Sequence, residues 1–273
     1  MLRPFKRKLS LAHFLLLVVV LAIAATQTFA IGAPIQNILP ELDEDESQVG
    51  QARIQIDIAE PLLSFIANAG QADANVRFMI KAGKQIVFFT PQEIVFAAGE
   101  ATEGEDSRSS VMRLRFSEAN EEVKVEGESP LPGVANFFLG NNPEKWRAKV
   151  PTYAAITYHD LYPGIDLIYS GKQSCLKSEF VVAAGADPTV IVMDYSGASA
   201  MYVREDGMLV LETPIGRLVE APPLIYQMID EERVTVDGGY CLLGNGEVAF
   251  ALGKYDPKEQ LVIDPALVYE NRT

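Results

Sequence analysis

Apolar and polar residues alternate with a period of two over most of the chain after Gly50. Side chains on successive strand residues point to opposite faces, so this alternation is typical of strands with one buried face. The clearest sets are Ile54, Ile56 and Ile58; Met112, Leu114 and Phe116; and Val123 and Val125. No segment after residue 60 keeps a 3.6-residue period long enough for a helix that would cover a parallel sheet. We therefore predict an all-β fold, an antiparallel β-sandwich-like arrangement.

Turn residues separate the predicted strands at intervals of roughly 8 to 12 residues, a spacing that favours hairpins and meanders. The turn signals are Ala82–Lys84, Thr90–Pro91, Asp206–Gly207, Ile215–Gly216, Asp237–Gly238 and Asn245–Gly246. Segments 85–89 and 92–97 both contain Ile-Val-Phe and flank Thr90–Pro91. We interpret them as the two arms of one hairpin rather than as a sequence repeat.

The first thirty residues have the pattern of a secretory signal. Four basic residues precede an apolar run from Leu11 to Ala25, and Thr28–Ala30 provides small residues at the positions that a signal peptidase reads. Cleavage after Ala30 is the favoured interpretation. An uncleaved anchor is the alternative, although the run has 15 residues and a membrane span needs about 20. Both interpretations predict that the folded part is exported to the cell surface or secreted.

The composition of the remaining chain indicates a leader segment and two further parts. Residues 31–50 form an acidic leader with five carboxylates between positions 41 and 46, a like-charge block that resists burial. The break around Ser129–Gly133 predicts a boundary between a β subdomain at 51–130 and a second one at 131–273, each within the usual size range of domains.

Net charge limits the possible partners. The chain has 23 basic and 37 acidic residues and a net charge of −14, which becomes −18 without the four basic residues of the signal segment. Nucleic acids and anionic membrane surfaces need basic protein surface, so we predict neither a nucleic-acid partner nor membrane contact beyond the signal segment.

Catalytic motifs are scarce. Of the two histidines, His13 lies in the signal segment, so a histidine-dependent mechanism would need His159 alone. The sequence has no G-x-S-x-G, H-E-x-x-H, C-x-x-C or phosphate-loop motif. The spacing of Gly244, Gly246 and Ala249 resembles a dinucleotide motif, but a second strand pattern follows it instead of a helix. We predict a non-enzymatic protein with no cofactor and no metal site.

Aromatic and acidic side chains between positions 146 and 166 are the candidate binding residues. They are Trp146, Arg147, Tyr153, Tyr158, Asp160, Tyr162 and Asp166. Aromatic rings at this density can stack on a sugar or anchor a protein, but they can equally fill the core between two sheets. The two aspartates can bind a sugar or a cation, or can cap a turn around Pro163–Gly164. Trp146, between Lys145 and Arg147, is the aromatic residue most expected at an exposed edge.

The chain has only two cysteines, Cys175 and Cys241. In an oxidising compartment this pair could form one disulfide. Two buried thiols that behave as small apolar groups are the alternative, and the choice depends on a geometry that spacing does not provide.

Dispersed motifs in one order resemble an uncharacterised domain of bacterial exported proteins that usually precedes β-propeller repeats of the SBBP type. The resembling segments are 135–143, Lys145–Arg147, Val150–Tyr153, Leu161–Tyr169, Gly185–Pro188, Asp206–Gly207, Tyr226–Gln227 and Val262–Pro265, after an opening that includes Phe65, Asn68, Gly70, Gln71 and Asp73. The resemblance covers about residues 62–269 and implies an extracellular β-rich module without known catalytic residues. Family members continue into the repeats, whereas this sequence ends four residues after Tyr269.

The expected function is therefore a secreted or cell-surface module for interaction or extracellular assembly, with a cell-surface protein or glycan as its partner. The alternative is a carbohydrate-binding module or glycoside hydrolase that uses the aromatic and acidic residues between Trp146 and Asp166.

Overall fold

The computed structural model describes residues 63–82, 85–99, 109–138, 140–172, 175–213 and 216–270. The predicted signal segment, the acidic leader and the alternating isoleucines at 54–58 lie outside the described residues. All of these described residues belong to one compact unit. Among the described residues, no helix is long and apolar enough to cross a membrane.

Nineteen strands and two short 3-10 turns make up the regular structure of the described residues, so the predicted all-β fold is confirmed. The strands of the first half are β1 (Phe65–Ala67), β2 (Phe78–Ala82), β3 (Gln85–Phe89), β4 (Glu93–Gly99), β5 (Ser109–Phe116), β6 (Lys124–Phe137), β7 (Arg147–Tyr162), β8 (Ile165–Lys172) and β9 (Cys175–Val182). The turns are η1 (Pro143–Lys145) and η2 (Pro188–Val190). The later strands are β10 (Met193–Ser196), β11 (Ala200–Val203), β12 (Leu209–Thr213), β13 (Gly216–Glu220), β14 (Leu224–Ile229), β15 (Glu232–Thr235), β16 (Gly238–Gly244), β17 (Glu247–Leu252), β18 (Leu261–Asp264) and β19 (Ala266–Glu270).

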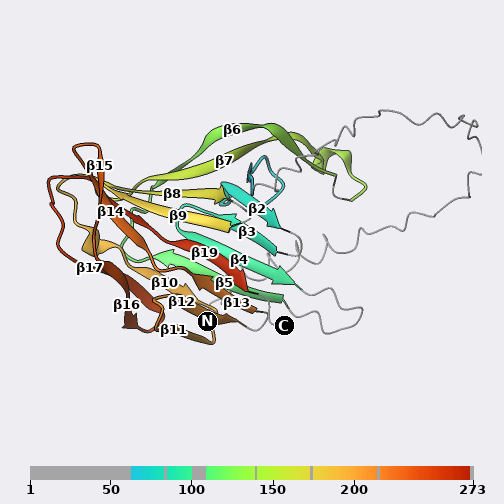
Figure 1. The fold of residues 1–273 in the computed structure, drawn as a ribbon. Helices are drawn as coiled ribbons and strands as arrows, with labels where there is room; N and C mark the ends of the chain where they lie inside the picture. Colours follow the sequence, from blue (N-terminus) through green and yellow to red (C-terminus); the bar gives the residue numbers. More distant parts are fainter. Residues whose placement is uncertain are drawn as a thin grey trace, which may run out of the picture. The chain divides into compact units, whose positions relative to one another are not determined.

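The strands form two antiparallel layers of a sandwich-like fold (Figure 1). One layer follows the pairings β1–β2–β3–β4–β5–β10–β17–β16. The other layer follows β6–β7–β8–β9, continues through β18 to β14 and β15, and through β19 to β13, β12 and β11. The short strand β1 also pairs with β7, which joins the two layers at one edge.

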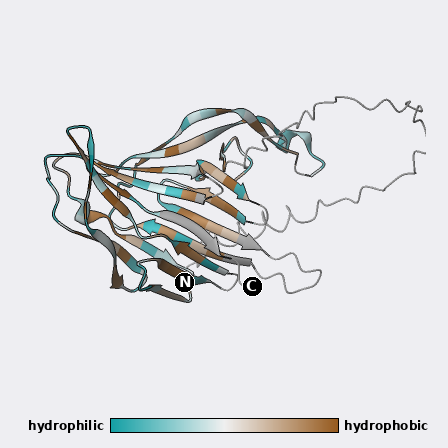
Figure 2. Cartoon of the chain, in the orientation of Figure 1, coloured by the Kyte–Doolittle hydropathy of each residue, from teal (hydrophilic) through white to brown (hydrophobic). Residues whose placement is uncertain are grey.

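Aromatic side chains connect the layers across the core. Phe180 on β9 lies with its ring centroid 6.3 Å from that of Phe116 on β5 and 5.7 Å from that of Phe250 on β17. All three belong to the main cluster of buried residues. Figure 2 shows apolar residues recurring among polar ones along these strands, as one buried face requires. Burial of each ring contributes roughly 1.5–3 kcal/mol to folding.

Several local predictions are confirmed. Met112, Leu114 and Phe116 are buried on β5. The segments around Thr90–Pro91 form the β3–β4 hairpin with Phe89 opposite Ile94, and Asn245–Gly246 forms the turn between β16 and β17. The glycine-containing motif at this turn is therefore followed by a strand and not by a helix.

The boundary predicted after residue 130 falls within β6, which runs from Lys124 to Phe137. The break in composition appears instead as a shift of strand register between Pro130 and Val134. Strands on the two sides of the boundary are hydrogen-bonded to each other, β1 to β7 and β5 to β10.

Candidate functional site

The far end of the β6–β7 hairpin is the most distinctive surface of the described chain, and we call its described residues, 130–138 and 140–150, the arm. From Lys124 to Glu128, β6 pairs regularly with β7, and beyond Ser129 the register shifts twice. Ser129 and Lys149 have positive φ angles of 52° and 56°. Such irregularities bend a strand pair and increase its twist. In Figure 1 the two strands run along the upper edge, and their ends reach beyond β8 and β9.

Large apolar side chains are exposed on the arm. Phe138 is 60% exposed, Val134 53% and Trp146 41%. The rings of Phe138 and Trp146 meet edge to face with centroids 5.5 Å apart, and the indole N–H donates to the Gly140 carbonyl oxygen at 3.1 Å. The pair is thus held in one arrangement while much of its apolar surface faces water. Exposed aromatic clusters of this kind are typical of contact surfaces.

A short turn explains why Trp146 is presented in this way. Asn142 is the N-cap of η1, and its side chain accepts a hydrogen bond from the Glu144 amide at 3.0 Å. Pro143 occupies the first position of the turn, where no amide donor is needed. The sequence Asn-Pro-Glu-Lys therefore forms one 3-10 turn and places the next residue, Trp146, at the C-cap of η1, directly before β7. The prediction that Trp146 lies at an exposed edge is confirmed.

Arg147 fastens the arm to the β1–β2 loop. Its Nε donates to the Ala69 carbonyl oxygen at 2.7 Å, and its Nη1 donates to those of Glu144 and Trp146 at 2.7 and 2.9 Å. Gly70, at φ +98°, passes so close that an added Cβ would lie 3.1 Å from the guanidinium. Arg147, which the sequence placed among the binding residues, is therefore a positioning residue for Trp146.

Replacement of Arg147 tests this role. Arg147→Ala removes three hydrogen bonds, each worth about 1 kcal/mol, and we expect faster amide hydrogen exchange in residues 140–150 with little change in exchange of β8 and β9. Lys149→Ala is the matched control because Lys149 is exposed. Equal exchange of the arm in the two variants would contradict the role.

Two of the predicted binding tyrosines are buried, which corrects that prediction. Tyr158 is 0% and Tyr162 1% exposed. The Tyr158 hydroxyl donates to the Thr90 carbonyl oxygen at 3.0 Å, and that of Tyr162 donates to the Ser117 carbonyl oxygen at 3.1 Å. Burial raises the pKa of both hydroxyls, that of Tyr162 to about 12. Because neither ring reaches the surface, both serve the core, as the alternative interpretation proposed.

Tyr153 is half-buried at the base of the arm. Its ring packs edge to face against Phe78 with centroids 5.7 Å apart. The other neighbour is Gly127 on β6, where an added Cβ would lie 2.6 Å from the ring. A side chain larger than hydrogen at Gly127 would displace the tyrosine, so Tyr153 has a packing role at the site where the hairpin leaves the sandwich.

The two aspartates cap a turn, as the structural interpretation predicted. The Asp160 amide donates to Oδ1 of Asp166 at 2.7 Å, and the Gly164 amide donates to Oδ1 of Asp160 at 3.3 Å. Asp160 has a φ of 48° at a shift of register in β7. Both carboxylates are therefore engaged by backbone amides of the β7–β8 turn.

His159 lies beside this turn in a surface network. Its Nε2 is 3.2 Å from Oε2 of Glu126, and its Nδ1 is 4.0 Å from Oδ2 of Asp166. Lys124 pairs with Glu126 at 2.8 Å, and this hydrogen bond is the main cause of the lowered pKa of Glu126. Among the described residues, no group of three or more His, Cys, Asp or Glu side chains is arranged to hold a metal ion.

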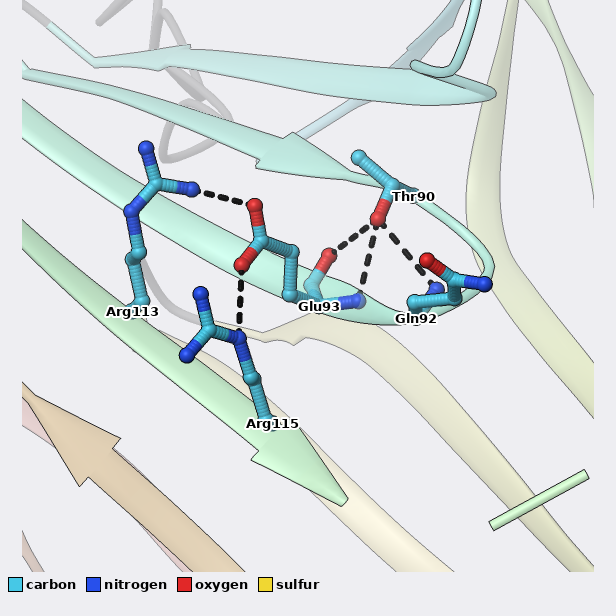
Figure 3. Close-up of polar contacts among 5 residues, drawn as sticks. All are labelled: Thr90, Gln92, Glu93, Arg113 and Arg115. Carbon is cyan, nitrogen blue, oxygen red and sulfur yellow. Dashed lines mark hydrogen bonds and ion pairs between the residues drawn. The ribbon is translucent and has the colours of Figure 1, made fainter. Parts of the chain in front are cut away.

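A charged cluster that the sequence did not indicate joins β4 and β5 (Figure 3). The Glu93 carboxylate contacts Arg113 through one oxygen and the Arg115 Nε through the other, the latter at 3.1 Å. Thr90 fixes the preceding turn, because its hydroxyl accepts from the Glu93 amide at 3.0 Å and donates to the Glu93 carbonyl oxygen at 2.8 Å. Both carboxylate oxygens are occupied by guanidinium groups, so the cluster connects two strands.

A second cluster that the sequence did not indicate lies in the core. Tyr195 on β10 donates its hydroxyl to Oε1 of Glu220 on β13 at 2.6 Å, and Tyr240 on β16 lies 3.0 Å from Oε2. Burial raises the pKa of Glu220, although the two tyrosine hydrogen bonds act in the opposite direction. This carboxyl group connects the two layers of the sandwich.

The two cysteines lie on strands that are not partners. Cys241 on β16 is exposed. Cys175 begins β9, but its side chain lies outside the described residues. In the described part of the chain, β16 pairs with β17 and β9 pairs with β8, β18 and β19. The disulfide stays a prediction.

A known domain family matches nearly the same range of residues as the strands of this fold. The family described as "Domain of unknown function (DUF7948)" matches residues 65–266, from β1 to the start of β19. Searches of curated proteins and of solved structures each gave no significant match. The match covers most of the chain and includes the arm, both layers of the sandwich and the core clusters. This chain therefore belongs to the DUF7948 family of domains of unknown function.

Proposed function

We propose that this protein is a non-enzymatic module of an exported bacterial protein, secreted or held at the cell surface, that binds a partner or joins an extracellular assembly through the arm. The observation that carries the proposal is the exposed pair Phe138 and Trp146. Aromatic anchors supply much of the binding energy of protein interfaces. A protein partner is favoured because Trp and Phe, the two exposed aromatic residues of this pair, are among the residue types most enriched in such contacts.

Export is supported by the sequence of the first thirty residues, in which basic residues precede an apolar run and a small-residue cleavage pattern. The resemblance to domains that precede SBBP-type repeats supports the same location. The catalytic alternative has little support in the arrangement of charged groups, because the carboxylates of Asp160, Asp166 and Glu93 are each engaged by amides or guanidinium groups.

Capture from intact cells tests the arm as the binding surface. We expect tagged wild-type protein to retain a partner after crosslinking. The Trp146→Ala variant should capture at least about tenfold less of this partner than the wild type, since loss of a central aromatic anchor costs about 2 kcal/mol or more of binding free energy. Tyr202→Ala is the matched control, because Tyr202 is 39% exposed on β11, away from the arm. Equal capture by the two variants would exclude the arm as the binding surface.

A glycan is the alternative partner, and the exposed indole is the observation that favours it. An aromatic face can stack on a sugar ring, and the polar edge of the exposed Trp146 is fixed by the Gly140 carbonyl oxygen. A glycan array separates the alternatives. Binding that disappears in Trp146→Ala would assign the arm to carbohydrate recognition instead of protein recognition.

A further inference from the structure

Basic residues that lack acidic partners lie close to Trp146 in the sequence of the arm. Lys145, Arg147 and Lys149 fall within five positions, and in the described chain none of them forms an ion pair with a carboxylate. The Arg147 guanidinium bonds only to backbone carbonyl oxygens. The arm has one acid, Glu144, against these three bases, so in a chain of net charge −14 it is a local cationic surface with exposed apolar rings.

The β14–β15 hairpin has the complementary composition. Its turn and the start of β15 contain Asp230, Glu231 and Glu232, all exposed, and no ion pair within the described residues involves them. Met228 and Val234 on either side of the turn are 46% and 43% exposed. This hairpin therefore combines three adjacent acids at its tip with one exposed apolar side chain on each of its faces, Met228 on one and Val234 on the other.

The conformation of the hairpin fixes the position of its acids. Asp230 and Glu231 both have positive φ angles, 50° and 67°, the combination that a two-residue type I′ turn requires. Asp tolerates this conformation, whereas Glu adopts it at some cost. Arg233, which follows Glu232 on β15, is stacked with its Cζ 3.6 Å from the centroid of the Tyr226 ring, so its charge is directed along the strands and away from the turn.

The arm and this hairpin lie at opposite ends of the sandwich in Figure 1, with β15 at one end and the tip of β6 and β7 at the other. They are thus too far apart to meet within one molecule. We propose that the arm of one copy binds the β14–β15 hairpin of a second copy, so that the chain associates head to tail. This inference rests on the proposed function of the arm and names its occupant. Such heterologous contacts produce rings or open filaments rather than closed dimers.

A contact between two hairpin tips is small, below about 1,200 Å² of buried surface, so the association is weak and sensitive to salt. The charges determine which copies can pair. If the charges of the arm alone are reversed, or those of the β14–β15 hairpin alone, like charges lie opposite each other and binding is suppressed. In a mixture of the two reversed forms, the arm of one form and the hairpin of the other again have opposite charges. The mean net charge of this mixture equals the net charge of the wild type.

Analytical ultracentrifugation of the full chain at low ionic strength tests this scheme. We expect concentration-dependent association of the wild type that weakens with added salt. Lys145→Glu with Lys149→Glu, and separately Glu231→Lys with Glu232→Lys, each raise the dissociation constant at least about tenfold. An equimolar mixture of the two double variants associates again, to within a few-fold of the wild type. Circular dichroism verifies that each variant keeps the strand signature.

Three outcomes would overturn the inference: a wild type that stays monomeric, double variants that associate like the wild type, or a mixture that associates no better than its components. Its failure is distinct from failure of the proposed function. If the wild type is monomeric but captures another protein in a manner that depends on Trp146, the arm still binds a partner, and that partner is not a second copy.

Discussion

Phe180→Ala is expected to lower the free energy of unfolding by about 3–5 kcal/mol, the usual cost of removing a buried phenylalanine ring. Phe180 is 1% exposed on β9, and its ring meets those of Phe116 and Phe250 from the opposite layer. Truncation therefore removes contacts of both layers at once and leaves a cavity that the surrounding strands fill only in part. The measurement is urea unfolding followed by circular dichroism.

Phe138→Ala is the matched control, because the same ring is removed from a residue that is 60% exposed. We expect a change of stability within about 0.5 kcal/mol, the usual range for surface substitutions. If Phe180→Ala does not fold, Phe180→Leu provides a smaller loss of the same sign. Similar losses from positions 138 and 180 would contradict the placement of Phe180 between the layers.

Glu220→Gln is expected to flatten the dependence of stability on pH. Burial raises the pKa of Glu220, so the native state keeps this proton at a pH where the unfolded chain, with the ordinary glutamate pKa of 4.5, has lost it. Stability that is present below pH 4.5 is then lost as the pH rises through the raised pKa. The glutamine side chain cannot ionise, so the variant lacks this loss.

The measurement is the urea midpoint of each variant from acid to neutral pH. Glu232→Gln is the control, because Glu232 is exposed and its substitution leaves the wild-type slope in place. Self-repulsion among the other acids affects all three proteins alike, so the difference between variants isolates Glu220. A Glu220→Gln variant with the wild-type slope would show that Glu220 is not the source of the pH dependence.

The fold class could be predicted from the sequence because alternation is a local signal. Met112, Leu114 and Phe116 reveal a half-buried strand on their own, and Thr90–Pro91 and Asn245–Gly246 reveal turns. The order of the strands could not be predicted. The pairing of β5 with β10 joins residues that are about 80 positions apart, and no local pattern encodes such a contact.

The candidate site was predicted only in part, for a physical reason. Trp146 stands out because charged residues and a turn surround it, and these features predict exposure. Tyr158 and Tyr162 have the same residue type as a binding aromatic, and their burial depends on how the two layers pack over β7. The Glu93 and Glu220 clusters depend on which strands lie opposite each other, so the sequence contained no signal for them.

A photoreactive amino acid at position 138 tests the arm most directly, with the same probe at position 202 as the reference. Both side chains are exposed, Phe138 at 60% and Tyr202 at 39%, but only the first lies on the arm. Irradiation of intact cells is expected to give a discrete covalent adduct from position 138 and none from position 202. Equal labelling from the two positions, or no adduct from position 138, would contradict binding through the arm.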